Sequence, residues 1–290
     1  MKKTFSFLLI AIFFSVSLSY GVENDKLHVT YIANEGFLIE GGGDKILIDA
    51  LFKNNAIDYC DVPSEGTLRK ILTGKPPFDD IVLLLFTHQH IDHFDANLVI
   101  DYMEYNEKCN LLGPQQVFDQ LSEFEKFEKI KSRIHAITPP YGRSEDININ
   151  GINLSALRFQ HSSYFVSDEQ TGEKIDRHKD VQNIGFVINL ANYKILHTGD
   201  SFIQNIEEYK SYRLDKEKID IAFLGWFFEP TLIEAVNNYI KPENITMMHL
   251  PKDKQMYFKL RDTHQSSLAP ITIFTKELEK KEFNKQPDIS

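Results

Sequence analysis

The sequence predicts an α/β fold, in which β-strands and α-helices alternate along the chain. Residues 81–86 form a continuous apolar run with β-branched and aromatic side chains, which is typical of a buried strand. Residues 96–108 place Leu98, Val99 and Tyr102 on one face at helical spacing. Each half of the chain opens with strands and then alternates strands with helices, which indicates an α/β layer.

In the first half, a hairpin is expected at residues 27–49, where two strand-like runs flank the Gly-Gly-Gly-Asp turn at 41–44. Pro76 and Pro77 mark a loop. The further elements expected in chain order are a helix over 64–72, a strand over 81–86, a helix over 96–108, a strand over 110–113 and a helix over 114–130.

The second half follows the same plan without visible repetition of sequence. Residues 162–182, which follow the strand expected over 152–161, form a long polar segment that is typical of a lid or a mobile loop. The charged tail at 276–290 is expected to fray. No linker divides residues 22–290, so we expect a single domain. The elements expected are a strand over 152–161, a hairpin over 184–200, a strand over 218–225, a helix over about 231–240 and a strand over 244–250.

The first 21 residues have the layout of a secretory signal peptide. A positively charged start, MKK, precedes an apolar run at residues 5–18, and small residues follow at 17, 19 and 21. The alternative is a membrane anchor, but the run is shorter than the ~20 residues that a membrane-spanning helix needs. We therefore expect an exported protein, periplasmic or secreted, that begins between Tyr20 and Glu23. After cleavage, no stable association with a membrane is expected.

Composition and charge exclude some classes of partner. Hydrophobic residues make up 42% of the chain and charged residues 26%, which is typical of a globular protein. The formal net charge is -10 and no basic stripe is visible, so no nucleic-acid partner is expected. Cys60 and Cys109 lie in different segments, and the sequence leaves open whether they pair. Neither has a CxxC partner, so a thiolate zinc site is not indicated.

A dense group of metal-ligand residues follows the strand expected over 81–86. The segment THQHIDH contains the pattern H-x-H-x-D-H, formed by His88, His90, Asp92 and His93. Neutral imidazoles and carboxylates suit zinc and similar divalent ions. A tight loop can turn alternate side chains to two sides and so serve two ions. One loop cannot complete two tetrahedral sites, so further ligands are expected at other strand ends.

Later strands end in residues of the required kind. His161 ends the strand expected over 152–161, Asp200 ends the hairpin over 184–200, and His249 stands near the end of the strand over 244–250. Each residue alone is typical of an ordinary cap or surface position. Together with the H-x-H-x-D-H loop, the three predict a metal site at one edge of the sheet structure.

These motifs resemble those of the metallo-β-lactamase superfamily over roughly residues 27–250. THQHIDH, His161, HTGD at 197–200 and His249 occur in the family's order and approximate spacing. The most similar branch includes ascorbate-6-phosphate lactonase and related metal-dependent hydrolases. The resemblance implies a four-layer αββα sandwich with a dinuclear metal site at one edge.

The resemblance also implies a role for each residue. Asp49, at the end of the strand ILIDA, would hold the H-x-H-x-D-H loop from outside the ligand set, with a strand-end cap as the alternative. Oxygen-reducing diiron relatives have an acid where His90 stands. His90 therefore favours two zinc ions and hydrolysis, with Mn²⁺ or Fe²⁺ as alternatives. The resemblance implies that His88, His90 and His161 would bind the first ion. Asp92, His93 and His249 would bind the second ion. Asp200 would bind both.

The expected chemistry is metal-assisted hydrolysis. Two cations about 3.5–4 Å apart can hold a bridging water and lower its pKa to about 7, and the resulting hydroxide attacks a carbonyl carbon or a phosphorus. Asp92 and Asp200 are the expected catalytic residues, because they would orient the hydroxide and move its proton. The substrate would be a small-molecule ester, lactone or phosphodiester. The alternatives are a non-catalytic metal or ligand binder, a hydrolase of β-lactams or other amides, and a nuclease. The oligomeric state stays open.

Other residues have an ordinary interpretation beside a functional one. His197 is expected to pack in its strand, with a supporting role at the site as the alternative. His178 is expected in a solvated loop, with contact to an anionic substrate as the alternative. Residues 226–228, Trp-Phe-Phe, are expected in the core, with a place in the pocket wall as the alternative. Aromatic residues of the two long loops are further candidates for the pocket wall: Phe52, Tyr59 and Tyr164.

Overall fold

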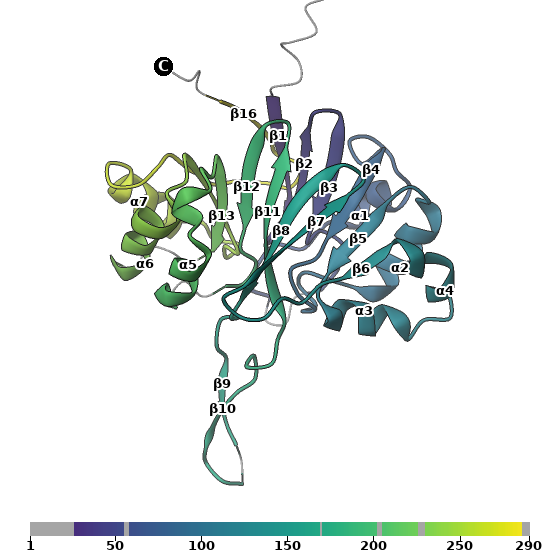
Figure 1. Cartoon of the computed structure of the whole chain (residues 1–290), viewed down its shortest axis with the longest axis horizontal. Helices are drawn as coiled ribbons and strands as arrows, with labels where there is room; N and C mark the ends of the chain where they lie inside the picture. The colour runs from purple at the N-terminus through teal and green to yellow at the C-terminus, as the bar shows by residue number, and fades with distance from the viewer. Residues whose placement is uncertain (1–25, 55–57, 169, 202–204, 226–229, 286–290) are drawn as a thin grey trace, which may run out of the picture.

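Two seven-stranded β-sheets face each other in the computed structural model of the chain, and helices cover the outer face of each sheet (Figure 1). The structure describes residues 26–54, 58–168, 170–201, 205–225 and 230–285. The expected signal peptide at residues 1–21 lies outside these ranges. The four-layer αββα sandwich that the resemblance implied is confirmed.

The first sheet has the strand order β16–β1–β2–β3–β4–β5–β6. Its antiparallel part runs from β16 to β3, and its parallel part from β3 to β6. The strands from the first half of the chain are β1 (Lys26–Ala33), β2 (Gly36–Gly41), β3 (Asp44–Ile48), β4 (Ile81–Leu85), β5 (Asn110–Gly113) and β6 (Ile134–Ala136).

The second sheet has the order β15–β14–β13–β12–β11–β8–β7. It is antiparallel from β7 to β12 and parallel from β12 to β15. The predicted hairpin turn is confirmed, because Ala191 and Asn192 join β11 to β12 with φ of 49° and 65°. Its strands are β7 (Ser144–Ile149), β8 (Ile152–Phe159), β11 (Asn183–Leu190), β12 (Tyr193–His197), β13 (Ile221–Gly225), β14 (Asn244–Met248) and β15 (Ile271–Thr272).

Alternate side chains of a strand point to opposite faces of its sheet, and this alternation builds the layers. In β2, Phe37 and Ile39 enter the core between the two sheets, whereas Leu38 packs under the helices of the first sheet. From the opposite sheet, Phe223 meets Phe37 with a ring-centroid distance of 4.7 Å. The two sheets therefore share one continuous core, and each has a second core beneath its own helices.

Helices of the first half cover the first sheet, and helices of the second half cover the other (Figure 1). Ser64 and Asp95 cap the first two helices, accepting hydrogen bonds from the backbone N–H groups of Thr67 and Leu98. The helical segments are α1 (Glu65–Leu72), α2 (Ala96–Tyr105), α3 (Gln115–Ser122), α4 (Phe127–Ile130), η1 (Lys131–Arg133), α5 (Ile206–Tyr212), η2 (Leu214–Lys216), α6 (Pro230–Ala235), η3 (Val236–Ile240) and α7 (Gln255–His264).

The expected single helix over 114–130 is wrong, because the chain breaks it into α3 and α4. At about 100° per residue, a continuous helix would turn Phe127 and Ile130 roughly 80° and 140° away from Val117. The break returns both side chains to the core beneath the sheet, where they are buried. The gain in apolar burial outweighs the few backbone hydrogen bonds that a break removes.

The structure adds a hairpin to one segment expected to be irregular and contradicts the expectation for another. The polar segment 162–182 contains a hairpin, β9 (Phe165–Ser167) paired with β10 (Lys174–Asp176), which projects from the body of the molecule (Figure 1). The tail does not fray over β16 (Lys280–Asn284), which pairs with β1. The reason is Phe283, which lies opposite Leu27 and is buried in the core between the sheets.

The structure also shows whether the two cysteines pair and whether a helix could span a membrane. Cys60 and Cys109 are both buried, and no disulfide joins them. Among the described residues, no helix combines the length and apolar character needed to cross a bilayer.

Candidate metal centre

The H-x-H-x-D-H loop lies at the carboxyl edge of the first sheet, between β4 and α2. Asp49, directly after β3, holds this loop. Its carboxylate accepts hydrogen bonds from the Thr87 backbone N–H at 2.8 Å and from the Thr87 hydroxyl at 2.5 Å. His93 Nδ1 lies 3.1 Å from the same carboxylate. Asp49 is fully buried, and its place against the loop matches the role that the resemblance implied.

Four of the predicted ligand residues form a first group of converging donors. The Nε2 atoms of His88 and His161 are 3.3 Å apart. Asp200 Oδ2 lies 3.3 Å from Nε2 of His161 and 3.8 Å from Nε2 of His88. His161 Nδ1 donates to the Ser162 carbonyl, so its Nε2 carries a lone pair that faces the group. The ligand atoms of four residues lie within 4.8 Å of one another: His88, His90, His161 and Asp200.

A second group of donors consists of Asp92, His93 and His249, whose ligand atoms also lie within 4.8 Å of one another. Asp92 Oδ2 is 3.9 Å from Nε2 of both histidines. Because Nδ1 of His93 contacts the Asp49 carboxylate, Nε2 of His93 is the atom that faces Asp92 and His249. His249 follows β14 with a φ of 53°, a left-handed conformation that is uncommon outside glycine and is concentrated at functional sites.

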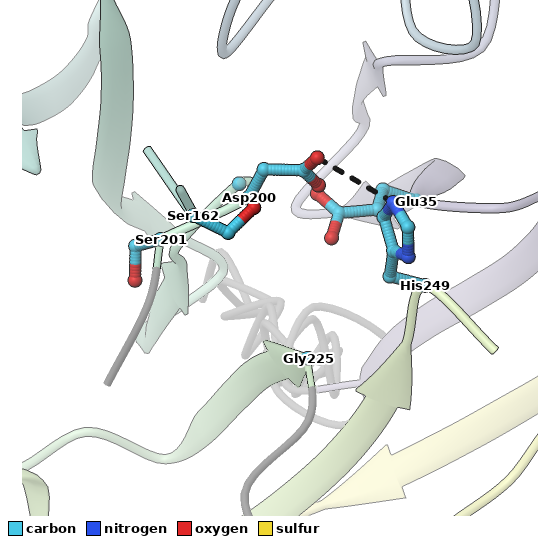
Figure 2. Close-up of a pocket in the computed structure, with 7 residues that line it drawn as sticks. Glu35, Ser162, Asp200, Ser201, Gly225 and His249 are labelled. Carbon is cyan, nitrogen blue, oxygen red and sulfur yellow. Dashed lines mark ion pairs between the residues drawn. The ribbon is translucent and has the colours of Figure 1, made fainter. Parts of the chain in front are cut away.

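Asp200 lies between the two groups of donors. Its Oδ1 is 3.4 Å from His93 Nε2 and its Oδ2 is 3.4 Å from His249 Nε2, the pair marked in Figure 2. The same carboxylate contacts His161 of the first group. The structure therefore brings all seven predicted ligand residues together, with Asp200 shared by both groups.

The electrostatics of the cluster suit cations. Burial lowers the pKa of His88 well below its usual value, and burial lowers the pKa of His90 to about 3, so both imidazoles are neutral. Burial alone would raise the pKa of Asp200, but His249 and His93 hold that pKa well below its usual range, so Asp200 is ionised. Neutral imidazole and ionised carboxylate are the forms that bind metals, and His88, His90 and Asp200 are in these forms. Against the effect of burial, the charge on Asp200 raises the pKa of His93 and of His249, so a metal would displace a proton from these two imidazoles. Nitrogen lone pairs and carboxylate oxygens that converge in a buried space fit divalent cations.

Known proteins resemble this chain in sequence and in fold. The model of the beta-lactamase superfamily domain matches residues 28–228, more than half of the chain. The chain belongs to this family. A UPF0173 metal-dependent hydrolase of Polynucleobacter asymbioticus is 26% identical over 181 residues, which is 58% of each chain. Another of that name from Polaromonas sp. is 26% identical over 77% of each chain. Our chain thus spans little more than half the length of the first of these relatives.

Solved structures show the same fold. Igni18, described as a novel metallo hydrolase from Ignicoccus hospitalis, superposes with a TM-score of 0.59 at 16% identity, covering 90% of this chain and all of that one. The predicted superfamily and fold are confirmed. The homologues are named metal-dependent hydrolases, and the seven-residue cluster of this chain is a candidate His/Asp metal site.

A glycine allows Asp200 to reach its place. Gly199 has a φ of +56°, and a Cβ there would lie 2.4 Å from Asn183 Oδ1 and 2.7 Å from Thr87 Cβ. We expect Gly199→Ala to lower the free energy of unfolding by about 1–3 kcal/mol. Gly151→Ala is the matched control, because Gly151 also has a positive φ but would meet nothing within 4 Å. Urea unfolding measures both variants, and equal destabilisation of the two would refute a role for the close contacts.

The sequence analysis missed Glu35, which lies in the turn between β1 and β2. Its side chain is fully buried, and its ligand atoms lie within 4.8 Å of those of His93 and Asp200. Burial, followed by the charge on Asp200, raises the pKa of Glu35 well above its usual value. The available signal was an acid just after an apolar strand, the same signal that identified Asp49 and Asp200.

His178 and His197 are both close to the cluster. The ring of His178 lies 4.7 Å from that of His90 and 4.4 Å from that of His161. The expectation of a solvated loop position is therefore wrong, because the hairpin of β9 and β10 returns His178 to the site. His197 packs in β12, as expected, and its Nε2 lies 3.1 Å from the Glu35 carbonyl oxygen.

Two cavities open on the cluster. The larger, about 590 Å³, is bordered by Asp92, His178 and two of the predicted aromatic residues, Tyr59 and Tyr164. Phe52 is buried and does not line it. The smaller, about 240 Å³, is bordered by Glu35, Asp200 and His249 among others (Figure 2). Residues 226–228, for which a place in the core or the pocket wall was expected, lie outside the described residues.

Proposed function

We propose that this chain is an exported hydrolase that uses two divalent metal ions, with zinc as the first choice, on a small-molecule ester, lactone or phosphodiester. The observation that carries the proposal is the pair of donor groups that share Asp200. One group supplies three histidines and the other supplies two histidines and Asp92. A fold with one complete group would favour a single ion, whereas two groups joined by one carboxylate favour two.

The residues present fit two cations. His88, His90 and His161 would hold the first, and Asp200 would contact both. Imidazole-rich donors with carboxylates suit zinc, and the histidine at position 90 supports hydrolysis rather than oxygen chemistry. Two such ions would supply an activated water and neutralise the charge that develops on the substrate. The second ion would be held by Asp92, His93 and His249.

Asp92 is the acid best placed to handle a proton. Its side chain is about 20% exposed, unlike the buried His93 beside it, and it borders the larger cavity. Its carboxylate therefore faces the space where a substrate and a water would meet. Asp200 borders the same cavity and would fix the position of that water. We assign Asp92 the transfer of the proton and Asp200 the orientation of the attacking water.

The larger cavity supports a small substrate with apolar and polar parts. Its volume of about 590 Å³ falls within the range of about 300–1,000 Å³ that is usual for small-molecule sites. Tyr59 and Tyr164 supply aromatic surface, and Gln89 and Gln120 supply amides. The net charge of -10 gives no support to a nucleic-acid substrate. Export is proposed from the signal-peptide layout of residues 1–21 alone.

The contacts of Asp49 with the H-x-H-x-D-H loop predict that this residue strengthens metal binding. Its carboxylate accepts from Thr87 and orients His93 without joining the donor groups. We expect Asp49→Asn to lower metal affinity by about 10–100-fold, because such supporting partners fix the direction of ligand lone pairs. Competition with a chromogenic chelator measures the affinity. Wild-type affinity in a folded Asp49→Asn protein would contradict the role.

The test of the proposed function is a hydrolysis panel on the protein without residues 1–21, loaded with zinc. The panel contains a simple phosphodiester, several lactones, a thioester and a β-lactam. We expect turnover of one ester, lactone or phosphodiester substrate, and its loss in Asp92→Ala. Turnover that Asp92→Ala retains, or a protein that binds no metal, would reject the proposal.

A further inference from the structure

Glu35 is buried beside the seven predicted ligand residues but has no role assigned among them. It is fully buried, and both of its carboxylate oxygens lack a hydrogen-bond partner among the described residues. His93 Nδ1 is 3.9 Å from Glu35 Oε2, but that nitrogen is engaged by Asp49 at 3.1 Å. A buried, unpartnered carboxylate is costly, so an ordinary structural role does not account for it.

Glu35 also faces a second carboxylate. The ligand atoms of Glu35, His93 and Asp200 lie within 4.8 Å of one another, and Asp200 Oδ1 likewise lacks a hydrogen-bond partner among the described residues. Figure 2 shows the carboxyl groups of Glu35 and Asp200 turned toward each other beside His249. Two ionised carboxylates in this arrangement would repel each other, and a cation between them would remove the repulsion.

We propose that Glu35 is a further metal ligand, which binds the ion held by Asp92, His93 and His249. This proposal rests on the two-ion centre of the proposed function and adds a residue to it. Glu35 borders the smaller cavity together with Asp200 and His249, whereas His90 and Asp92 border the larger one. It would thereby add a donor to the second position from outside the H-x-H-x-D-H loop.

The added carboxylate makes the two positions chemically different. The first position has three imidazoles and a share of Asp200. The second then has two imidazoles and three carboxylates, counting the shared Asp200. Imidazole-rich sites suit zinc, whereas oxygen-rich sites suit harder cations such as Mn²⁺. The second position is therefore selective for Mn²⁺ relative to the first.

The experiment compares Mn²⁺ and Zn²⁺ binding by the wild type, Glu35→Gln and a control, Asp220→Asn. Asp220 is a buried carboxylate directly before β13, whereas Gly225 at the other end of that strand borders the smaller cavity. Free Mn²⁺ is followed by electron paramagnetic resonance, and bound metals are counted by mass spectrometry. We expect Glu35→Gln to lower Mn²⁺ affinity at one position at least tenfold, with a smaller loss for Zn²⁺ there. The other position and the Asp220→Asn variant should match the wild type.

Two Mn²⁺ ions bound by Glu35→Gln with wild-type affinity would overturn the assignment of Glu35 and leave the two-ion centre standing. A wild type that binds fewer than two ions would overturn both. If Glu35→Gln does not fold, wild-type crystals soaked with Mn²⁺ decide the question by anomalous diffraction. A Glu35 oxygen within bonding distance of the second ion supports the proposal, and one beyond bonding distance rejects it.

Discussion

Replacing Asp92 by alanine is expected to lower hydrolytic turnover by about 10²–10⁴-fold and to leave the fold intact. The loss follows because the Asp92 carboxylate has two functions. It contributes a donor to the second group, and it borders the larger cavity, where we propose that it transfers the proton. Initial rates on whichever substrate the panel identifies measure the effect, with metal content determined in parallel.

The fold should survive because few contacts depend on this carboxylate. The closest polar neighbours of Asp92 Oδ2 are Asn34 Nδ2 at 3.5 Å and the Nε2 atoms of His93 and His249, each at 3.9 Å. The backbone carbonyl of Asp92, which accepts from Asn34, is retained in the variant. Asp101→Ala is the matched control, because Asp101 is an exposed acid on α2 paired only with Lys126 in the described structure. An Asp92→Ala protein as active as Asp101→Ala would refute the catalytic assignment.

Removing the metals is expected to abolish activity and to lower the melting temperature. Without cations, Glu35 and Asp200 face each other in a buried space, and only protonation of Glu35 and of the nearby imidazoles offsets their repulsion. An ion present at 1,000 times its Kd stabilises the folded state by about 4 kcal/mol. For a chain of this size that corresponds to a shift of roughly 10 °C for each ion.

Dialysis against a strong chelator, followed by scanning fluorimetry and rate measurements, tests this expectation. Adding Zn²⁺ back should restore both the melting temperature and the activity, which separates metal loss from irreversible unfolding. A metal-free protein that keeps its melting temperature would show that the cluster is not occupied in solution.

The candidate metal site was predictable because its signal is local. His88, His90, Asp92 and His93 lie within six residues, and the other three candidate ligand residues each follow an apolar strand. Because strands carry their ends to the same edge of the sheets, a rule about strand ends was enough to assemble seven residues. The same rule applies to Glu35, but the run before the turn at 41–44 was interpreted as one strand, whereas the structure divides it into β1 and β2 with Glu35 in the turn between them.

The features that sequence patterns did not predict depend on contacts between distant segments. The break between α3 and α4 is set by the need to bury Phe127 against the first sheet. His178 reaches His161 only because β9 and β10 pair and return the chain to its start. The pairing of β16 with β1 joins residues about 250 positions apart, and a charged composition conceals it. A pattern read over a short stretch of sequence contains only one of the two strands, so it cannot show that they pair.

The pairing of β16 with β1 also decides what the molecule presents at that border of the first sheet. Without it, β1 would offer a row of open backbone donors and acceptors beside Leu27 and Val29, a template on which another chain could add a strand. The outermost strand is instead one that begins with two lysines, Lys280 and Lys281, and lysines disfavour such addition. A chain without residues 280–284 would therefore expose the edge of β1 and is expected to self-associate more readily.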